Sequence, residues 1–224
     1  MDPFVIFFIL ALIFSIIIHE VSHGYAAAML GDSTARLQGR LTLNPIPHID
    51  LIGTILVPGA LILLQAPFLF GWAKPVPYNP YNLRNQKWGE AIVAGAGPGV
   101  NILIALVFGL IARFGFGTLP TDFIVLCAVL VFINILLAIF NLLPFPPLDG
   151  SKLLKSTLPF RANMAFQKFE AFIMGGGVLM MLLMLWLILQ VVGPFIGIAL
   201  LYAFTAITGL PAGILCEGIP WMCG

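Results

Sequence analysis

The sequence predicts an all-α polytopic membrane protein with about five to six membrane segments. Hydrophobic residues make up 61% of the 224 residues and charged residues only 8%, whereas soluble domains carry about 25% charged residues. Several apolar runs reach the roughly 20 residues that a helix needs to cross a bilayer. This composition excludes a soluble enzyme and a secreted disulfide scaffold. A net charge of +1 gives no basic surface for nucleic acid, so the expected surrounding is lipid.

Each predicted segment has its own pattern. The first is uninterrupted after Pro3, whereas the second contains two glycines, two prolines and a glutamine, which weaken it as a span. The third opens with closely spaced glycines, which permit close helix packing. The fourth ends in a proline-rich stretch that cannot stay helical. The six segments lie at about residues 3–30, 51–70, 89–113, 122–143, 171–192 and 194–210.

The first segment contains an HExxH motif, His19-Glu20-Val21-Ser22-His23. Side chains four residues apart share a helix face, about 6 Å apart along the axis, so two imidazoles can reach one zinc ion. The glutamate between them is placed to act as a general base toward an attacking water. Because ionisable groups inside a membrane span are costly, the motif favours a functional site over a chance match.

A catalytic zinc usually has a third protein ligand, and several residues are candidates. Asp149 is favoured because it follows a proline-broken stretch, which at membrane depth is tolerated only where the backbone lines a cavity. His48 is the rival, although a lone loop histidine is weak evidence. The other candidate carboxylates are typical of interfacial or loop positions: Asp32, Asp50 and Asp122.

These motifs resemble the site-2 protease family of intramembrane zinc metalloproteases. The resemblance rests on the HExxH motif and on the stretch from Asn141 to Asp149-Gly150 far downstream. Gly97-Pro98-Gly99-Val100-Asn101, Leu41-Thr42-Leu43-Asn44-Pro45 and the following His48-Ile49-Asp50 are also similar to motifs of its small prokaryotic members. The resemblance covers about residues 8–155. We expect neither the PDZ nor the CBS domain that many relatives carry.

The resemblance implies a role for each residue of the site. His19, His23 and Asp149 would bind one zinc ion per chain, and Glu20 would be the general base. Asn141 would hold the substrate or the oxyanion. The family cleaves peptide bonds of membrane-embedded proteins, so the implied partner is a transmembrane protein or peptide.

Two further residues and the domain organisation complete these expectations. His48 and Asn101 are additional candidate site residues. Residues 1–210 are expected to form one membrane-embedded metalloprotease domain, followed by a short tail, 211–224, with no assigned role.

The positions of the predicted ligands constrain the topology. His19 lies in the C-terminal half of the first segment, and Asp149 lies beyond the C-terminal end of the fourth. The two segments should therefore run in the same direction for these residues to share a metal ion. One of the two intervening segments is then an incomplete span, and 51–70 is the candidate for a re-entrant element. The alternative is that the extended stretch 144–149 returns into the membrane. With 51–70 re-entrant, nine of the ten Lys and Arg residues lie on one side and only Arg113 on the other, against seven and three if every segment spans.

The positive-inside rule then places the zinc site toward the cytoplasm. If the last two segments both span, Cys216 and Cys223 are cytoplasmic too and remain reduced.

The predicted function is zinc-dependent intramembrane endopeptidase activity in a prokaryotic cell membrane. The alternative is a membrane zinc-binding or transport protein without proteolytic activity. Glu20 favours hydrolysis, because a transporter needs metal ligands but no base between them. The sequence identifies neither the substrate nor the oligomeric state.

Overall fold

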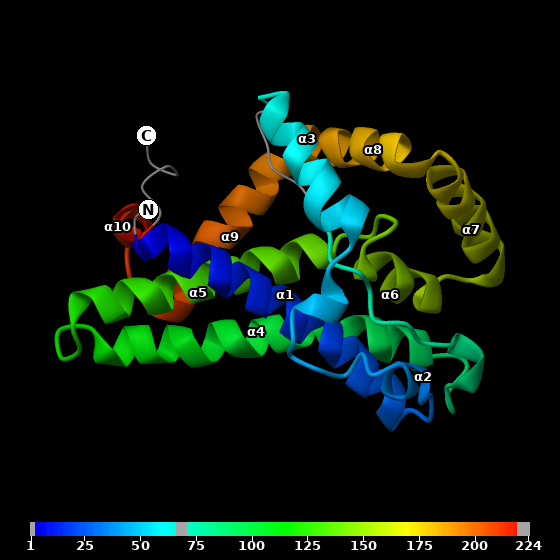
Figure 1. The fold of residues 1–224 in the computed structure, drawn as a ribbon, viewed down its shortest axis with the longest axis horizontal. Coiled ribbons are helices and arrows are strands. Elements are labelled where there is room, and N and C mark those ends of the chain that lie inside the picture. Colours follow the sequence, from blue (N-terminus) through cyan, green and yellow to red (C-terminus); the bar gives the residue numbers. More distant parts are fainter. Residues whose placement is uncertain (1–2, 66–70, 219–224) are drawn as a thin grey trace.

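Three long helices lie side by side and form a bundle, α1, α4 and α5 (Figure 1). The structure, a computed structural model, describes residues 3–65 and 71–218. All regular elements in these ranges are helical, which confirms the predicted all-α class. The α-helices are α1 (Pro3–Met29), α2 (Thr34–Leu37), α3 (Val57–Leu63), α4 (Gly89–Gly115), α5 (Thr121–Asn141), α6 (Asp149–Thr157), α7 (Phe160–Gly175), α8 (Gly177–Val191), α9 (Gly193–Thr208) and α10 (Leu215–Gly218). The shorter elements are the 3₁₀ turns η1 (Ile46–His48), η3 (Pro80–Asn82) and η4 (Ala212–Ile214) and the π-helix η2 (Leu51–Leu56).

Within the bundle, α1 and α5 run in the same direction and α4 runs against both (Figure 1). Small side chains are buried in its core, among them Ala11, Ala105 and Ala128. In lipid, where apolar burial gives little drive for association, small residues let helices approach closely. This packing holds the C-terminal half of α1 beside the start of α4, where the predicted metal ligands lie.

Fewer helices than expected are long enough to span a membrane. In the described part of the chain, α1, α4 and α5 pass on length and hydropathy, and a fourth span results only if α7 and α8 are counted together. These two helices are bent by 115° at a glycine-rich break, so 171–192 is not a straight crossing. The helix at Leu51–Leu61 and α9 are shorter apolar helices, and five to six full segments are not confirmed.

The segment predicted to be re-entrant leaves the site region and returns to it. The backbone N–H of Trp72 donates to the carbonyl of Gly53 at 3.1 Å, so both ends of 53–72 lie at one place. Residues 66–70 are outside the described range. That 51–70 is re-entrant therefore stays a prediction.

The last residues that the structure describes, η4 and α10, lie at the opposite end of the bundle from the predicted ligands (Figure 1). Leu215 packs in the same core cluster as Ala11 of α1, and Leu210 packs against Ala112 and Ile124. Cys216 is disulfide-bonded, whereas Cys223 lies outside the described residues. This placement corrects the expectation of a reduced tail on the zinc side, because the bend between α7 and α8 removes one of the two straight crossings on which that expectation rested.

Candidate metal centre

The two histidines of the HExxH motif lie on one face of α1, directed into the bundle. His19 and His23 are buried, with 5% and 8% of the residue surface exposed. Their Nε2 atoms are 3.1 Å apart, and the rings meet edge to face with centroids 4.7 Å apart. The helical spacing of four residues thus brings two nitrogen ligands to one point, as the sequence predicts.

Asp149 completes a three-ligand group from a distant part of the chain. The chain turns after α5 through a proline-rich stretch, and Asp149 is the first residue of α6. Its Oδ2 lies 3.1 Å from the Nε2 atoms of both His19 and His23. Among the described residues, these three form the one group of His, Cys, Asp or Glu with ligand atoms mutually close enough for a metal ion, within 4.8 Å.

This arrangement fits zinc. Two nitrogens and one carboxylate oxygen match the His₂-carboxylate set of catalytic zinc sites, which leaves a fourth position for water or substrate. Tetrahedral bonds of 2.0–2.1 Å place neighbouring ligand atoms about 3.3 Å apart, close to the observed 3.1 Å.

The surroundings of Asp149 favour its ionised form. Burial opposes ionisation, but the hydrogen bonds with His19 and His23 and the charge of Lys152 outweigh it, so the pKa of Asp149 lies below its ordinary value. Lys152 Nζ is 3.7 Å from Asp149 Oδ1. The position in the first turn of α6 also favours a negative charge. A metal ligand must be deprotonated, and this site holds the carboxylate in that form.

Helix α4 contacts both histidine rings through its backbone, at Val93 and Gly97. His23 Nδ1 lies 2.7 Å from the carbonyl oxygen of Val93. Because that oxygen can only accept, Nδ1 carries the hydrogen and Nε2 is left for a metal. One turn further, a Cβ on Gly97 would come 2.5 Å from His23 Nε2 and 2.6 Å from His19 Nε2. Only glycine leaves room here for both imidazoles.

Glu20 is held by the extended segment that precedes α4. Its Oε2 accepts the backbone N–H of Val76 at 3.1 Å. The same segment is anchored two residues before this contact: Lys74 N–H donates to the carbonyl of His48 at 2.8 Å, and Arg40 Nη2 donates to the carbonyl of Lys74 at 2.9 Å. The candidate base is thus oriented by a backbone donor at the edge of the ligand group.

The structure does not bring His48 to the metal ligands. Its side chain is buried, and Nε2 donates to the carbonyl of Thr42 at 2.9 Å, so it braces its own loop. Asp32 likewise binds loop atoms, Asp50 caps η2 by accepting from Gly53 N–H at 2.7 Å, and Asp122 lies at the exposed start of α5.

The two candidate asparagines differ in their surroundings. Asn141, at the end of α5, is partly buried and donates from Nδ2 to the carbonyl of Leu137 at 2.9 Å. Asn101 is fully buried, and neither atom of its amide has a partner. The structure assigns no role to Asn141, and its action on substrate stays a prediction.

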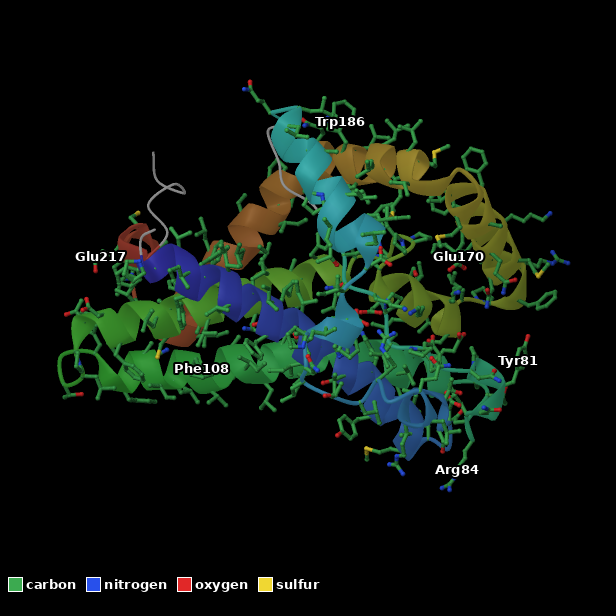
Figure 2. All side chains as sticks on the ribbon, in the orientation of Figure 1. Tyr81, Arg84, Phe108, Glu170, Trp186 and Glu217 are labelled. Atoms are coloured by element: carbon green, nitrogen blue, oxygen red, sulfur yellow. The ribbon has the colours of Figure 1, made fainter. Side chains whose placement is uncertain are left out.

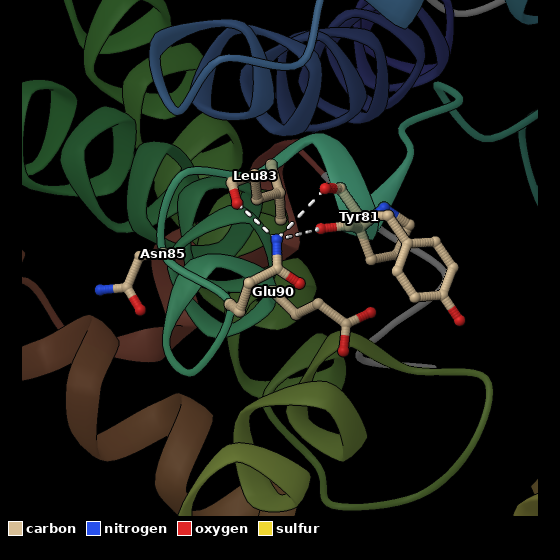
Figure 3. A pocket seen from close by; sticks show the side chains of 6 residues that line it. Tyr81, Leu83, Asn85 and Glu90 are labelled. Carbon is tan, nitrogen blue, oxygen red and sulfur yellow. Dashed lines mark hydrogen bonds between the residues drawn. The ribbon is translucent and has the colours of Figure 1, made fainter.

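A hollow of about 260 Å³ lies apart from the ligand group, at the loop before α4 (Figure 3). Leu83, Tyr81 and Glu90 are among its lining residues. The Gln86 amide nitrogen donates to the carbonyls of Pro80, Tyr81 and Leu83. This hollow contains none of the predicted ligands and is a feature of the loop.

Sequence reasoning missed the residues that act through their backbone. Val93 and Val76 contribute a carbonyl and an N–H, which carry no sequence signal. Gly97 stood in a quoted motif, yet the reason for a glycine there appears only when α4 packs against α1. Ser15 and Asn134, which form a buried hydrogen bond of 3.0 Å, were polar residues in apolar runs, a signal that could have found them.

Comparison with known proteins decides the family. Residues 117–184 match peptidase family M50. The "Putative zinc metalloprotease YwhC" of Bacillus subtilis is 36% identical over 176 residues, which cover 75% of this chain and 77% of that protein. The chain belongs to peptidase family M50. This confirms the site-2 protease resemblance, with zinc as the cofactor.

More distant relatives carry the same description. The "Putative zinc metalloprotease Rip2" of Mycobacterium tuberculosis is 28% identical over 184 residues, or 82% of this chain and 68% of that protein. Its namesake in Mycolicibacterium smegmatis is 29% identical over 136 residues, or 61% and 51%. No solved structure matches the chain. The family and the apolar helices together indicate an integral membrane metalloprotease.

Proposed function

We propose that this M50 member is an intramembrane endopeptidase that cleaves membrane-embedded protein substrates, with Glu20 as its general base. The observation that carries the proposal is the ligand group itself. His19, His23 and Asp149 are each less than 10% exposed, and two of them lie within a helix long and apolar enough to span a membrane. A site built at that depth acts on chains that share the bilayer.

The residues divide the chemistry as follows. Zinc, when bound, supplies Lewis acidity toward a carbonyl and toward water. Glu20 takes a proton from the attacking water and returns it to the leaving amine. The Val76 N–H holds one carboxylate oxygen of Glu20 and so fixes its orientation. Asn141, eight residues before Asp149, holds the substrate backbone or the developing oxyanion once its amide releases the Leu137 carbonyl.

We also propose that the site opens toward the cytoplasm, in a prokaryotic cell membrane. Figure 2 shows nitrogen- and oxygen-bearing side chains gathered at the end of the molecule around α2, α6 and α7, where Arg84 and Glu170 are labelled. Arg113, by contrast, is in the last turn of α4, at the end where that helix meets α5. This asymmetry supports the cytoplasmic placement by the positive-inside rule.

The test compares the native chain with Glu20→Gln. Zinc content of the purified protein is measured together with cleavage of a helical membrane-span peptide in detergent or vesicles. Glutamine keeps the size of Glu20 but has no basic carboxylate, so the variant is expected to keep stoichiometric zinc and to lose cleavage by at least about 100-fold, the lower range for a general base.

The outcomes separate the two functions. Zinc in both proteins with cleavage only by the native chain supports the proposal. Zinc in both with cleavage by neither, over several substrates, favours the zinc-binding or transport alternative. Equal cleavage by both would show that Glu20 is not the base.

A further inference from the structure

The two zinc-binding histidines differ in what holds the far side of each ring. His23 Nδ1 donates to the Val93 carbonyl at 2.7 Å, whereas His19 Nδ1 is buried and has no partner. A histidine that binds metal through Nε2 carries a hydrogen on Nδ1, and such ligands almost always donate that hydrogen to an acceptor that fixes the ring. His19 therefore requires an acceptor.

Asn101 is a fully buried side chain, 0% exposed, whose amide lacks hydrogen-bond partners on both its atoms, Oδ1 and Nδ2. Leaving such a group unpaired costs about 1–3 kcal/mol. In a protein whose neighbouring core is apolar, an unpaired amide at this depth indicates that the residue serves another group.

The packing of α1 against α4 directs Asn101 toward His19. Gly97 lies against the His19 ring, and Asn101 is one helical turn later on the same face of α4. Side chains on a helix lean toward its N-terminus and cover the preceding turn. The Asn101 side chain therefore leans back over the turn of Gly97, where the His19 ring lies.

The unpaired atoms of this region also match in chemical type. Asn134 donates from Nδ2 to Ser15 Oγ at 3.0 Å and to the Leu130 carbonyl at 2.9 Å, which leaves its Oδ1 as an unpaired acceptor. Ser15 is one turn before His19 on α1. Two unpaired donors, His19 Nδ1–H and Asn101 Nδ2–H, are thus matched in number by two unpaired acceptors, Asn101 Oδ1 and Asn134 Oδ1.

We propose that Asn101 is a positioning residue for the metal centre: buried water joins its Oδ1 to the Nδ1–H of His19 and its Nδ2 to Asn134 Oδ1. This chain of hydrogen bonds, from His19 through Asn101 and Asn134 to Ser15, would fix the ring of His19, as the Val93 carbonyl fixes the ring of His23. A buried water needs two to four polar partners, and these side chains supply them. The inference rests on the proposed zinc site but not on the reaction performed there.

The test measures zinc affinity by competition with a chelator, for the native chain, Asn101→Leu and Asn101→Asp. Leucine is close in size to asparagine but accepts no hydrogen bond, and the zinc dissociation constant is expected to rise about 10- to 100-fold, as for other partners of ligating histidines. Aspartate keeps an acceptor, so affinity is expected within about threefold of native on the same reasoning.

Thr208→Val is the matched control. It removes the polar group of another fully buried side chain, the Thr208 hydroxyl in α9, and is expected to leave zinc affinity unchanged. Thermal unfolding of the zinc-free proteins checks folding. Asn101→Leu is expected to fold but to melt below the native temperature, because it leaves His19 Nδ1 and Asn134 Oδ1 without their partner. Should it fail to fold, Asn134→Leu, which removes the acceptor for Asn101 Nδ2, is expected to weaken zinc binding severalfold.

Native zinc affinity in Asn101→Leu would overturn the inference, as would an equal loss in Asn101→Leu and Asn101→Asp. Because the readout is metal binding, this failure is distinct from that of the proposed function. A native chain that binds zinc but cleaves nothing leaves the role of Asn101 open to the same measurement.

Discussion

The bundle and the arch formed by α7 and α8 are packed very differently, although α8 is as apolar as the helices of the bundle. In α5, 61% of the most apolar 18-residue window is buried, whereas α7 buries one residue, Ile173, and α8 two, Leu185 and Ile188. Figure 1 shows the arch extending away from the bundle, and Trp186 lies on its outer side (Figure 2). The metal ligands all lie in the bundle or at its edge, so precise geometry coincides with dense packing.

The largest effect should follow from a single methyl group at Gly97. A Cβ there would lie 2.5 Å from His23 Nε2, inside van der Waals contact, so Gly97→Ala must displace both imidazoles or separate α4 from α1. We expect the zinc dissociation constant to rise more than about 100-fold, beyond the loss from removing an outer partner of a ligand, and cleavage to vanish.

The control is Gly99→Ala on the same helix. Nothing lies within 4 Å of a Cβ at Gly99, and alanine is the better helix former, so zinc binding and stability should be native or slightly improved. Equal zinc affinity in the two variants, measured by chelator competition, would contradict the close approach of α4 to the histidines.

The second largest effect is expected at Asp32, which binds the loop that contains Asn79 and Asn82. Asp32 is fully buried and accepts from Asn79 N–H at 2.7 Å and from Asn82 Nδ2 at 2.9 Å. Burial alone would raise the pKa of Asp32, but hydrogen bonds from Thr34, Asn82 and Asn79 outweigh it and hold the pKa below its ordinary value. Asp32→Asn should lower the free energy of unfolding by about 1.5–3 kcal/mol near neutral pH, the range for hydrogen bonds to a charged group.

The stability difference between the native protein and Asp32→Asn should depend on pH in a defined direction. Because the folded-state pKa of Asp32 is lowered, its contribution is complete above the unfolded value of about 3.9 and declines as the pH falls through the lower folded value. Thermal unfolding from pH 7 to pH 3 should therefore show the native and Asp32→Asn proteins converging only at the acid end. A gap that stays constant, or that widens in acid, would contradict this account.

The same contrast explains what could be predicted from the sequence. HExxH is a local pattern, so one helix suffices to bring His19 and His23 together, and the proline-broken approach singled out Asp149. Non-local packing decided the rest. The hydrogen bond from Val76 N–H to Glu20 depends on a neighbour far along the chain. Hydropathy detects apolar runs but not where a run bends, so 171–192 resembled a single span.

A smaller effect is expected in the arch, at the bend. Gly177 has a φ of +62° with nothing within 4 Å of a Cβ, so Gly177→Ala adds backbone strain without a clash, about 1 kcal/mol. Gly175, also open but without a positive φ, is the control, and Gly175→Ala should be neutral. Thermal unfolding should resolve the pair, while zinc affinity stays native in both. A loss of zinc in Gly177→Ala would show that the arch and the metal centre are coupled more tightly than their packing indicates.

The smallest effect is expected at the ion pair that joins α6 to α7 of the arch. Lys155 of α6 donates to Glu170 of α7 at 2.9 Å, with both side chains partly exposed. Such pairs contribute about 0–1 kcal/mol and are screened by salt. A double-mutant cycle of Lys155→Met and Glu170→Gln, followed by thermal unfolding at low and high salt, should give a coupling in that range that shrinks as salt rises. A coupling above about 2 kcal/mol, or one independent of salt, would mean that the pair is shielded from water and that α7 is held to the metal-binding end far more firmly than its exposed surface indicates.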